Sequence, residues 1–214
     1  MGLILFYVLV PRSWWPGWNK LIRTLPYNTG AVDILGMIMY AAAVALVCFG
    51  LSLHQKPLED LLGKLWSRWQ DALRDLAIGA VFWMLVRYVD RLIYYLADAR
   101  PAPRRLVPHT VRDLMISILF AIAAGVAEEI VFRGYLQKQF TALWGNRAAA
   151  ILIKAGMFAC YHGYHQALPV FGQHFVFALL AASLAQWRES LLPGMIGHAW
   201  FDAYWDVLKL AKLA

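Results

Sequence analysis

The sequence is short of charged residues and of cysteines, and both shortages limit the class of protein. Charged residues occupy 15% of the 214 positions, whereas about a quarter is typical of a soluble domain. The two cysteines, Cys48 and Cys160, lie inside apolar runs, so a disulfide framework is not expected. The sequence also lacks a repeat, a low-complexity tract and a linker rich in Pro, Gly or Ser. These absences predict a single transmembrane domain over residues 1–214.

Positive charge outweighs negative charge, but it is not gathered into a patch. The net charge is +7, with 20 Lys and Arg against 13 Asp and Glu. The basic residues are scattered between apolar segments, whereas binding to nucleic acid needs a dense basic stripe or patch. Scattered basic residues that flank apolar segments are typical of contacts with anionic lipid headgroups. We therefore expect a lipid bilayer around the protein and no nucleic acid as a partner.

Hydrophobic residues make up 61% of the sequence and are grouped into long segments. About 20 mostly apolar residues cross the hydrocarbon core of a bilayer as a helix. We expect about six spanning helices, at residues 31–53, 76–97, 114–143, 148–162, 170–187 and 192–210. The first ten residues are apolar, but they have no basic n-region and no small-residue cleavage site follows, so we expect an interfacial segment rather than a signal peptide. Residues 11–30 are rich in Trp and basic residues, which is typical of a headgroup boundary. The predicted fold class is all-α, a polytopic transmembrane helix bundle.

Several ionisable residues fall inside these apolar segments. Each costs about 2.5–3.5 kcal/mol at the bilayer centre on insertion scales, so its presence indicates a compensating structure or a function. Arg87 and Asp90 are three residues apart in the second span, which predicts an internal ion pair. Three other stretches hold the remaining candidates, which are Glu128, Glu129 and Arg133; His162; and His198 with Asp202.

The first of these stretches is AEEIVFRGYL, residues 127–136. Glu129 and Arg133 are spaced i,i+4, so on a helix they share a face and can pair. Glu128 points in another direction, because successive residues are separated by about a quarter to a third of a helical turn. One carboxylate is then neutralised and the other is available for acid–base chemistry. The alternative is a buried ion-pair triad that only holds helices together.

The second stretch is matched in depth to the first. Glu128 lies 17 residues before Gly145 and His162 lies 17 residues after it. If Gly145 marks the turn between two antiparallel helices, both side chains lie about 25 Å from it, at 1.5 Å per residue. A carboxylate that faces an imidazole at one depth is a plausible acid–base pair.

The third stretch is GHAWFDAYWD, in the last span. His198 and Asp202 are spaced i,i+4, so Asp202 can hold one imidazole nitrogen and fix the ring. The other histidines are expected to be peripheral, at loops or helix ends; they are His54, His109, His165 and His174. His162 and His165 alone do not predict a metal site, because a third ligand and an ordered surrounding shell are needed.

The three stretches resemble the motifs of a known family. The resemblance rests on EEIVFRG, FACYH and HAWFD, which are similar to the patterns EExxxR, FxxxH and HxxxN or HxxxD of the CPBP family. This family contains CAAX-prenyl endopeptidases and bacteriocin-processing proteins and is also called ABI. The resemblance covers residues 114–210. It implies an intramembrane endopeptidase of the glutamate type, with a catalytic core at 112–210 and N-terminal helices and interfacial segments at 1–111.

The resemblance also implies a role for most motif residues. Glu128 is expected to be the general base, and His162 is expected to lie beside the water that it activates. His198 is expected to donate a hydrogen bond to the developing oxyanion. Glu129 and Arg133 are expected to form a supporting ion pair.

Two further motif positions complete the candidate site. Phe158 is the first residue of the FxxxH motif and is expected to support the site. Asp202 stands where the oxyanion-stabilising residue of the family is Asn. Because an ionised carboxylate repels an oxyanion, we expect Asp202 either to be protonated or to orient His198. The implied substrate is a membrane-associated peptide or protein, with no cofactor, and the expected location is a prokaryotic inner membrane.

Three alternatives remain open at the level of sequence. Glu128, His162 and His198 could bind zinc with a water in the fourth position, which would make a zinc-dependent membrane protease. No HExxH pair supports this alternative. The bundle could instead be a non-enzymatic immunity or scaffold protein that binds a partner within the membrane. A proton-coupled transporter is the third alternative, since carboxylate and histidine relays also occur in transporters.

Overall fold

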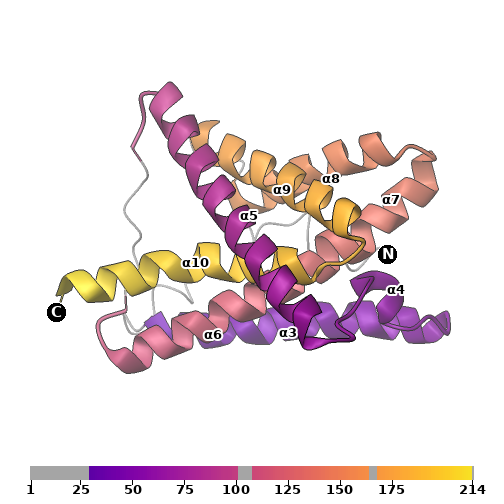
Figure 1. Ribbon diagram of the computed structural model, residues 1–214, viewed down its shortest axis with the longest axis horizontal. Coiled ribbons are helices and arrows are strands. Elements are labelled where there is room, and N and C mark those ends of the chain that lie inside the picture. The colour runs from indigo at the N-terminus through magenta and orange to yellow at the C-terminus, as the bar shows by residue number, and fades with distance from the viewer. Residues whose placement is uncertain (1–28, 101–107, 164–167, 214) are drawn as a thin grey trace, which may run out of the picture.

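Helices account for the regular secondary structure of residues 29–100, 108–163 and 168–213, the part that this computed structural model describes (Figure 1). Within that part, the extended pairing is limited to one isolated bridge between Gly63 and Ser190. The predicted all-α class is confirmed. The interfacial segments expected before residue 29 lie outside the described residues.

The helices follow the predicted segments closely. They are α3 Thr29–Leu53, α4 Glu59–Leu62, α5 Trp69–Leu96, α6 Val111–Glu128, the π-helical segment η2 Glu129–Leu136, α7 Gln137–Trp144, α8 Arg147–Gly163, α9 Leu168–Arg188 and α10 Leu192–Leu213. Helix α5 begins before the predicted span. Its start is set by Asp71, whose Oδ2 accepts hydrogen bonds from the backbone N–H groups of Ser67 and Arg68.

Three helices of the described part are long and apolar enough to cross a membrane. They are Gly30–Leu53, Val111–Trp144 and Leu168–Arg188. The predicted count of about six spans is therefore not confirmed. Helices α5 and α10 carry several charged residues, and α8 has 17 residues, slightly fewer than the roughly 20 that a span needs.

Close helix crossings hold α10 against its neighbours, and two glycines permit them. Helix α10 packs on α6 and is crossed by α5 (Figure 1). A Cβ on Gly125 of α6 would lie 2.9 Å from the backbone nitrogen of Ala199 in α10, and a Cβ on Gly197 would lie 2.8 Å from the carbonyl oxygen of Gly79 in α5. Small residues allow membrane helices to approach closely. These contacts place His198 beside the motif on α6.

Backbone hydrogen bonds join α4 to the turn between α9 and α10. Gly63 has a φ of +74°, and a Cβ there would lie 2.2 Å from the carbonyl oxygen of Glu189, so only glycine fits. The backbone N–H of Lys64 donates to that carbonyl oxygen at 2.7 Å, and the N–H of Leu191 donates to the carbonyl of Leu62 at 2.9 Å. The turn is thereby held close to η2, which α4 also contacts.

The predicted ion pair of the second span is present. Arg87 Nη1 lies 3.4 Å from Asp90 Oδ2, and both side chains are buried. The guanidinium also lies over the rings of Tyr204 and Trp205 of α10, at 4.9 Å and 4.3 Å from their centroids. The pair therefore joins α5 to α10, which agrees with a structural role.

Candidate active site

The carboxylate motif lies where the central helix changes from α-helical to π-helical winding. Helix α6 ends at Glu128, and η2 begins at Glu129. Residues 127–134 are all buried, so this turn passes through the middle of the bundle. Wider π-helical turns are frequent at functional sites, because the extra residue per turn changes the direction of the side chains that follow. Here Glu128 faces one cavity, while Glu129 and Arg133 lie behind it.

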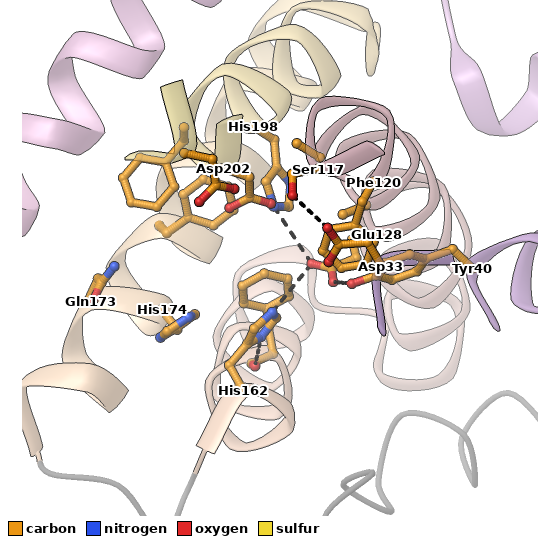
Figure 2. A pocket seen from close by; sticks show the side chains of 16 residues that line it. Asp33, Tyr40, Ser117, Phe120, Glu128, His162, Gln173, His174, His198 and Asp202 are labelled. Atoms are coloured by element: carbon orange, nitrogen blue, oxygen red, sulfur yellow. Dashed lines mark hydrogen bonds and ion pairs between the residues drawn. The ribbon is translucent and has the colours of Figure 1, made fainter. Parts of the chain in front are cut away.

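The cavity beside Glu128 has a volume of about 470 Å³ (Figure 2). Its walls come from α3, α6, α8, α9 and α10. The side chains that line it include Asp33, Tyr40, Ser117, Glu128, Phe158, His162, Gln173, His174, His198, Asp202 and Asp206. The structure thus brings Glu128, Phe158, His162, His198 and Asp202 together in one place, from three helices that are distant in the sequence.

The two oxygens of Glu128 have different surroundings. Oε1 accepts a hydrogen bond of 2.6 Å from the hydroxyl of Tyr40. Oε2 faces the Nε2 atoms of His162 and His198, at 3.6 Å and 3.7 Å (Figure 2). Oε2 has no hydrogen-bond partner among the described residues, because both distances exceed that of a direct hydrogen bond. Tyr40 thus holds Oε1 of Glu128 in place, and Oε2 is available to react.

His162 presents a defined tautomer to Glu128. Its Nδ1 lies 2.9 Å from the carbonyl oxygen of Phe158, and because a carbonyl only accepts, Nδ1 carries the proton. The Nε2 atom of the neutral ring is then a lone-pair acceptor that faces the carboxylate oxygen. Two acceptors at this distance need a proton or an intervening donor between them. The matched depth predicted from the positions of Glu128 and His162 about Gly145 agrees with this approach.

His198 is held from the side opposite Glu128. Its Nδ1 lies 3.2 Å from Glu129 Oε1, and Arg133 Nη1 lies 3.1 Å from the same oxygen. The expected Glu129–Arg133 pair is therefore present, and it also orients the imidazole. Asp202 Oδ2 lies 3.7 Å from Nε2 of His198, on the cavity side of the ring. Glu129 thus accepts the hydrogen bond that fixes the ring, whereas the sequence spacing predicted Asp202 as the acceptor.

Phe158 supports both halves of the site through its ring. The ring lies 4.3 Å from that of His162 and 5.7 Å from that of Phe177, centroid to centroid. The guanidinium of Arg133 lies 4.5 Å from the centroid of Phe158. The ring is almost fully buried, so it fixes the position of His162 on one side and covers the arginine on the other.

Tyr40 and His174 contact the predicted site residues directly but were not predicted to belong to the site. Tyr40, from α3, donates to Glu128 and carried no sequence signal, since it stands alone in an apolar span. His174 was expected to be peripheral, and this expectation was wrong. It lines the cavity and its ring stacks on that of His162, with centroids 4.5 Å apart and planes 18° apart. Its position six residues after the start of α9 explains the difference, because the ring faces the bundle interior. His165 lies outside the described residues.

The zinc alternative receives no support from the arrangement of possible ligands. Within the described ranges, no group of three His, Cys, Asp or Glu side chains is placed to hold a metal ion. Nδ1 of His162 and Nδ1 of His198 are engaged with Phe158 and Glu129, so the Nε2 atoms are the nitrogens that face Glu128.

Comparison with known proteins gives one match. The family model described as type II CAAX prenyl endopeptidase, Rce1-like, matches residues 110–204. This range contains all three motifs, so the match confirms the resemblance to the CPBP family. No curated protein and no solved structure matches significantly. The family is one of membrane proteases, and together with the apolar helices it supports an integral membrane hydrolase that acts on a membrane-embedded peptide or protein.

Proposed function

We propose that the protein is an intramembrane endopeptidase of the glutamate type, in which Glu128 and His162 activate a water molecule. The observation that carries this proposal is the convergence of two imidazole nitrogens on the buried Glu128 Oε2, at 3.6 Å and 3.7 Å, beside a cavity. That oxygen has no hydrogen-bond partner among the described residues, so it is available to a water molecule. The catalytic core is 112–210, but Tyr40 reaches it from the N-terminal half, so both halves form one working domain.

The attack step follows from the geometry around Glu128. A water that lies between Oε2 of Glu128 and Nε2 of His162 donates one hydrogen to each acceptor. Its oxygen lone pair then faces the substrate carbonyl carbon. As the C–O bond forms, Glu128 takes a proton from the water, and it later passes this proton to the leaving amine as the C–N bond breaks. Tyr40 keeps the carboxylate in place during both transfers, because it binds the other oxygen.

His198 stabilises the oxyanion if its Nε2 carries a proton. Its Nδ1 proton is engaged with Glu129, so donation from Nε2 requires the doubly protonated, cationic ring. The carboxylates of Glu129 and Asp202, at 3.2 Å and 3.7 Å from its two nitrogens, favour that cation. Asp202 thus acts on His198 rather than on the oxyanion directly. This resolves the conflict that an Asp in place of Asn creates.

The deciding experiment compares membranes that contain wild-type protein with membranes that contain Glu128→Gln. Gln keeps the shape of Glu but cannot accept a proton, so an uncut precursor of the substrate should accumulate and identify both the reaction and the substrate. The matched control is Glu59→Gln, because Glu59 is exposed on α4. Full biological effect from Glu128→Gln would contradict the protease and favour a binding or scaffold protein.

A second arm tests the zinc alternative and the location. Activity of the purified protein in a strong chelator, together with its metal content, separates the two chemistries, because a water activated by Glu128 needs no metal. Loss of activity in chelator that added zinc restores would contradict the proposal. We also propose a prokaryotic inner membrane as the location, and membrane fractionation tests this.

A further inference from the structure

A second cavity lies on the other side of the motif, at the level of the turn between α7 and α8. Its volume is about 590 Å³. It is enclosed by α4, η2, α7, the start of α8, the end of α9 and the turn before α10. Three of its lining side chains are basic, namely Arg133, Lys138 and Arg147, and one is acidic, Glu189. Glu189 is ion-paired with Lys64, so the basic side chains dominate the lining.

Arg133 gives this cavity a buried cationic wall. The residue is 2% exposed and lines this cavity, whereas it is absent from the lining of the first. Its Nη1 pairs with Glu129, and its face is covered by Phe158. Nε and Nη2 have no hydrogen-bond partner among the described residues. The side chain is fully buried, so its charge attracts an anion in the cavity without direct contact.

Other polar groups of the cavity are also arranged as donors. The Oε1 of Gln137 accepts from the buried Nζ of Lys154 at 3.1 Å, which leaves the Gln137 amide NH₂ as the group that can bind a ligand. The Oγ of Ser190 accepts from the backbone N–H of Leu192 at 3.3 Å, so its hydroxyl hydrogen can point to a ligand. A lining of cations and donors selects an anion.

The level of the cavity in the bilayer indicates the source of that anion. Trp144 ends α7 and Trp187 lies at the end of α9, and the two side chains are 49% and 71% exposed. Tryptophans in such positions mark the boundary between hydrocarbon and headgroups. The anions concentrated at that boundary are the phosphates of anionic lipids.

We propose that this cavity is a binding site for a phosphate group, carried by an anionic lipid headgroup or by free phosphate. The phosphate oxygens accept from Lys138 and Arg147 at the rim, and the buried charge of Arg133 attracts the anion from inside. Binding itself does not depend on the proposed protease activity, so the two can fail separately.

The test uses the full chain in detergent and two probes, inorganic phosphate and dihexanoyl-phosphatidylglycerol, with chloride at equal ionic strength as the reference. Each probe is expected to raise Tm by about 3 °C or more near saturation, as for a ligand bound only by the folded state. The variant pair Lys138→Gln and Arg147→Gln is expected to weaken the apparent affinity by about tenfold or more, because two charge-assisted contacts are removed. Both residues are exposed, so Tm in chloride should stay unchanged.

The matched control is the pair Lys56→Gln and Arg112→Gln, which removes the same charge from exposed positions outside the cavity. It should respond to both probes as the wild type does. A shift with the lipid alone identifies the headgroup as the source, and a shift with both probes identifies phosphate itself as sufficient. The proposal is overturned if neither probe differs from chloride, or if the Lys138 and Arg147 variant responds like the wild type. Single variants at each position repeat the test if the double variant does not fold.

Discussion

Asp75 and Glu128 are both buried carboxylates, 1% and 3% exposed, but their surroundings differ. Asp75 Oδ1 accepts from Arg188 Nη2 at 2.7 Å, and Oδ2 accepts from Trp66 Nε1 at 3.0 Å. Glu128 has a donor, Tyr40, on one oxygen only, and its other oxygen faces two imidazoles beyond hydrogen-bond distance. Each oxygen of Asp75 is thus paired, which is typical of a structural anchor. Glu128 has one oxygen available for a reaction, so two equally buried carboxylates differ in the groups that surround them.

The largest effect is expected for Glu128→Gln. It should lower kcat by about 10²–10⁴-fold, because the general base is lost, and leave Tm close to that of the wild type. Single-turnover cleavage of the identified substrate and a thermal melt in detergent measure the two quantities. The contrast between the two carboxylates is contradicted if Glu128→Gln lowers Tm as much as Asp75→Asn does and leaves the cleaved fraction per folded molecule unchanged.

The opposite pattern is expected for Asp75→Asn. Removing one partner of a buried pair leaves Arg188 without its counter-charge, which costs about 3–5 kcal/mol of unfolding free energy. Tm should fall by roughly 6–20 °C at about 2–4 °C per kcal/mol, while kcat of the remaining folded protein stays within about twofold. Double substitution with Arg188→Met should recover part of the loss. A normal Tm with reduced kcat would instead make Asp75 part of the reaction.

A smaller decrease in kcat is expected for Tyr40→Phe, which tests the one hydrogen bond that Glu128 accepts. A hydrogen bond to a charged group contributes about 1.5–3 kcal/mol, so kcat should fall by about 10–100-fold. KM should change little, because the bond positions the base. The control is Tyr88→Phe, at an exposed site on α5. A raised KM with normal kcat would show that Tyr40 contacts substrate and does not position Glu128.

The smallest effect is expected at the exposed pair of Lys64 and Glu189. The hydrogen bond from Lys64 lowers the pKa of Glu189, and the charge of Lys64 adds to this. A lowered pKa contributes stability above the unfolded value that is lost as pH falls through the folded value. Because both side chains are largely exposed, solvent screens the pair, and Glu189→Gln should leave Tm within measurement error from pH 5 to 8. A clear decrease in Tm would show that this pair stabilises the fold, as the buried pair of Asp75 and Arg188 does.

Much of the candidate site was predictable because it depends on local periodicity. The i,i+4 spacing of Glu129 and Arg133, and of His198 and Asp202, predicted two close pairs, and both are present at 3.1 Å and 3.7 Å. Glu128 and His162 are equally many residues from Gly145, which predicted that these two side chains also lie close together. The partner of His198 Nδ1 was not predictable in this way. This contact depends on the π-helical turn at Glu129. The sequence motif was interpreted as an ordinary α-helix, in which that turn is absent.

Apolar composition, helix periodicity and the spacing of the three motifs determined the membrane-type all-α class, most helix boundaries to within a few residues and the pairs within one helix. These properties depend on neighbours along the chain, where the geometry of the helix is known in advance. Only the tertiary structure decided that Tyr40 binds Glu128, 88 residues away, and that Glu129 binds His198, 69 residues away. Such contacts depend on how helices cross at positions such as Gly125 and Gly197, and a crossing is set by the packing of both surfaces at once.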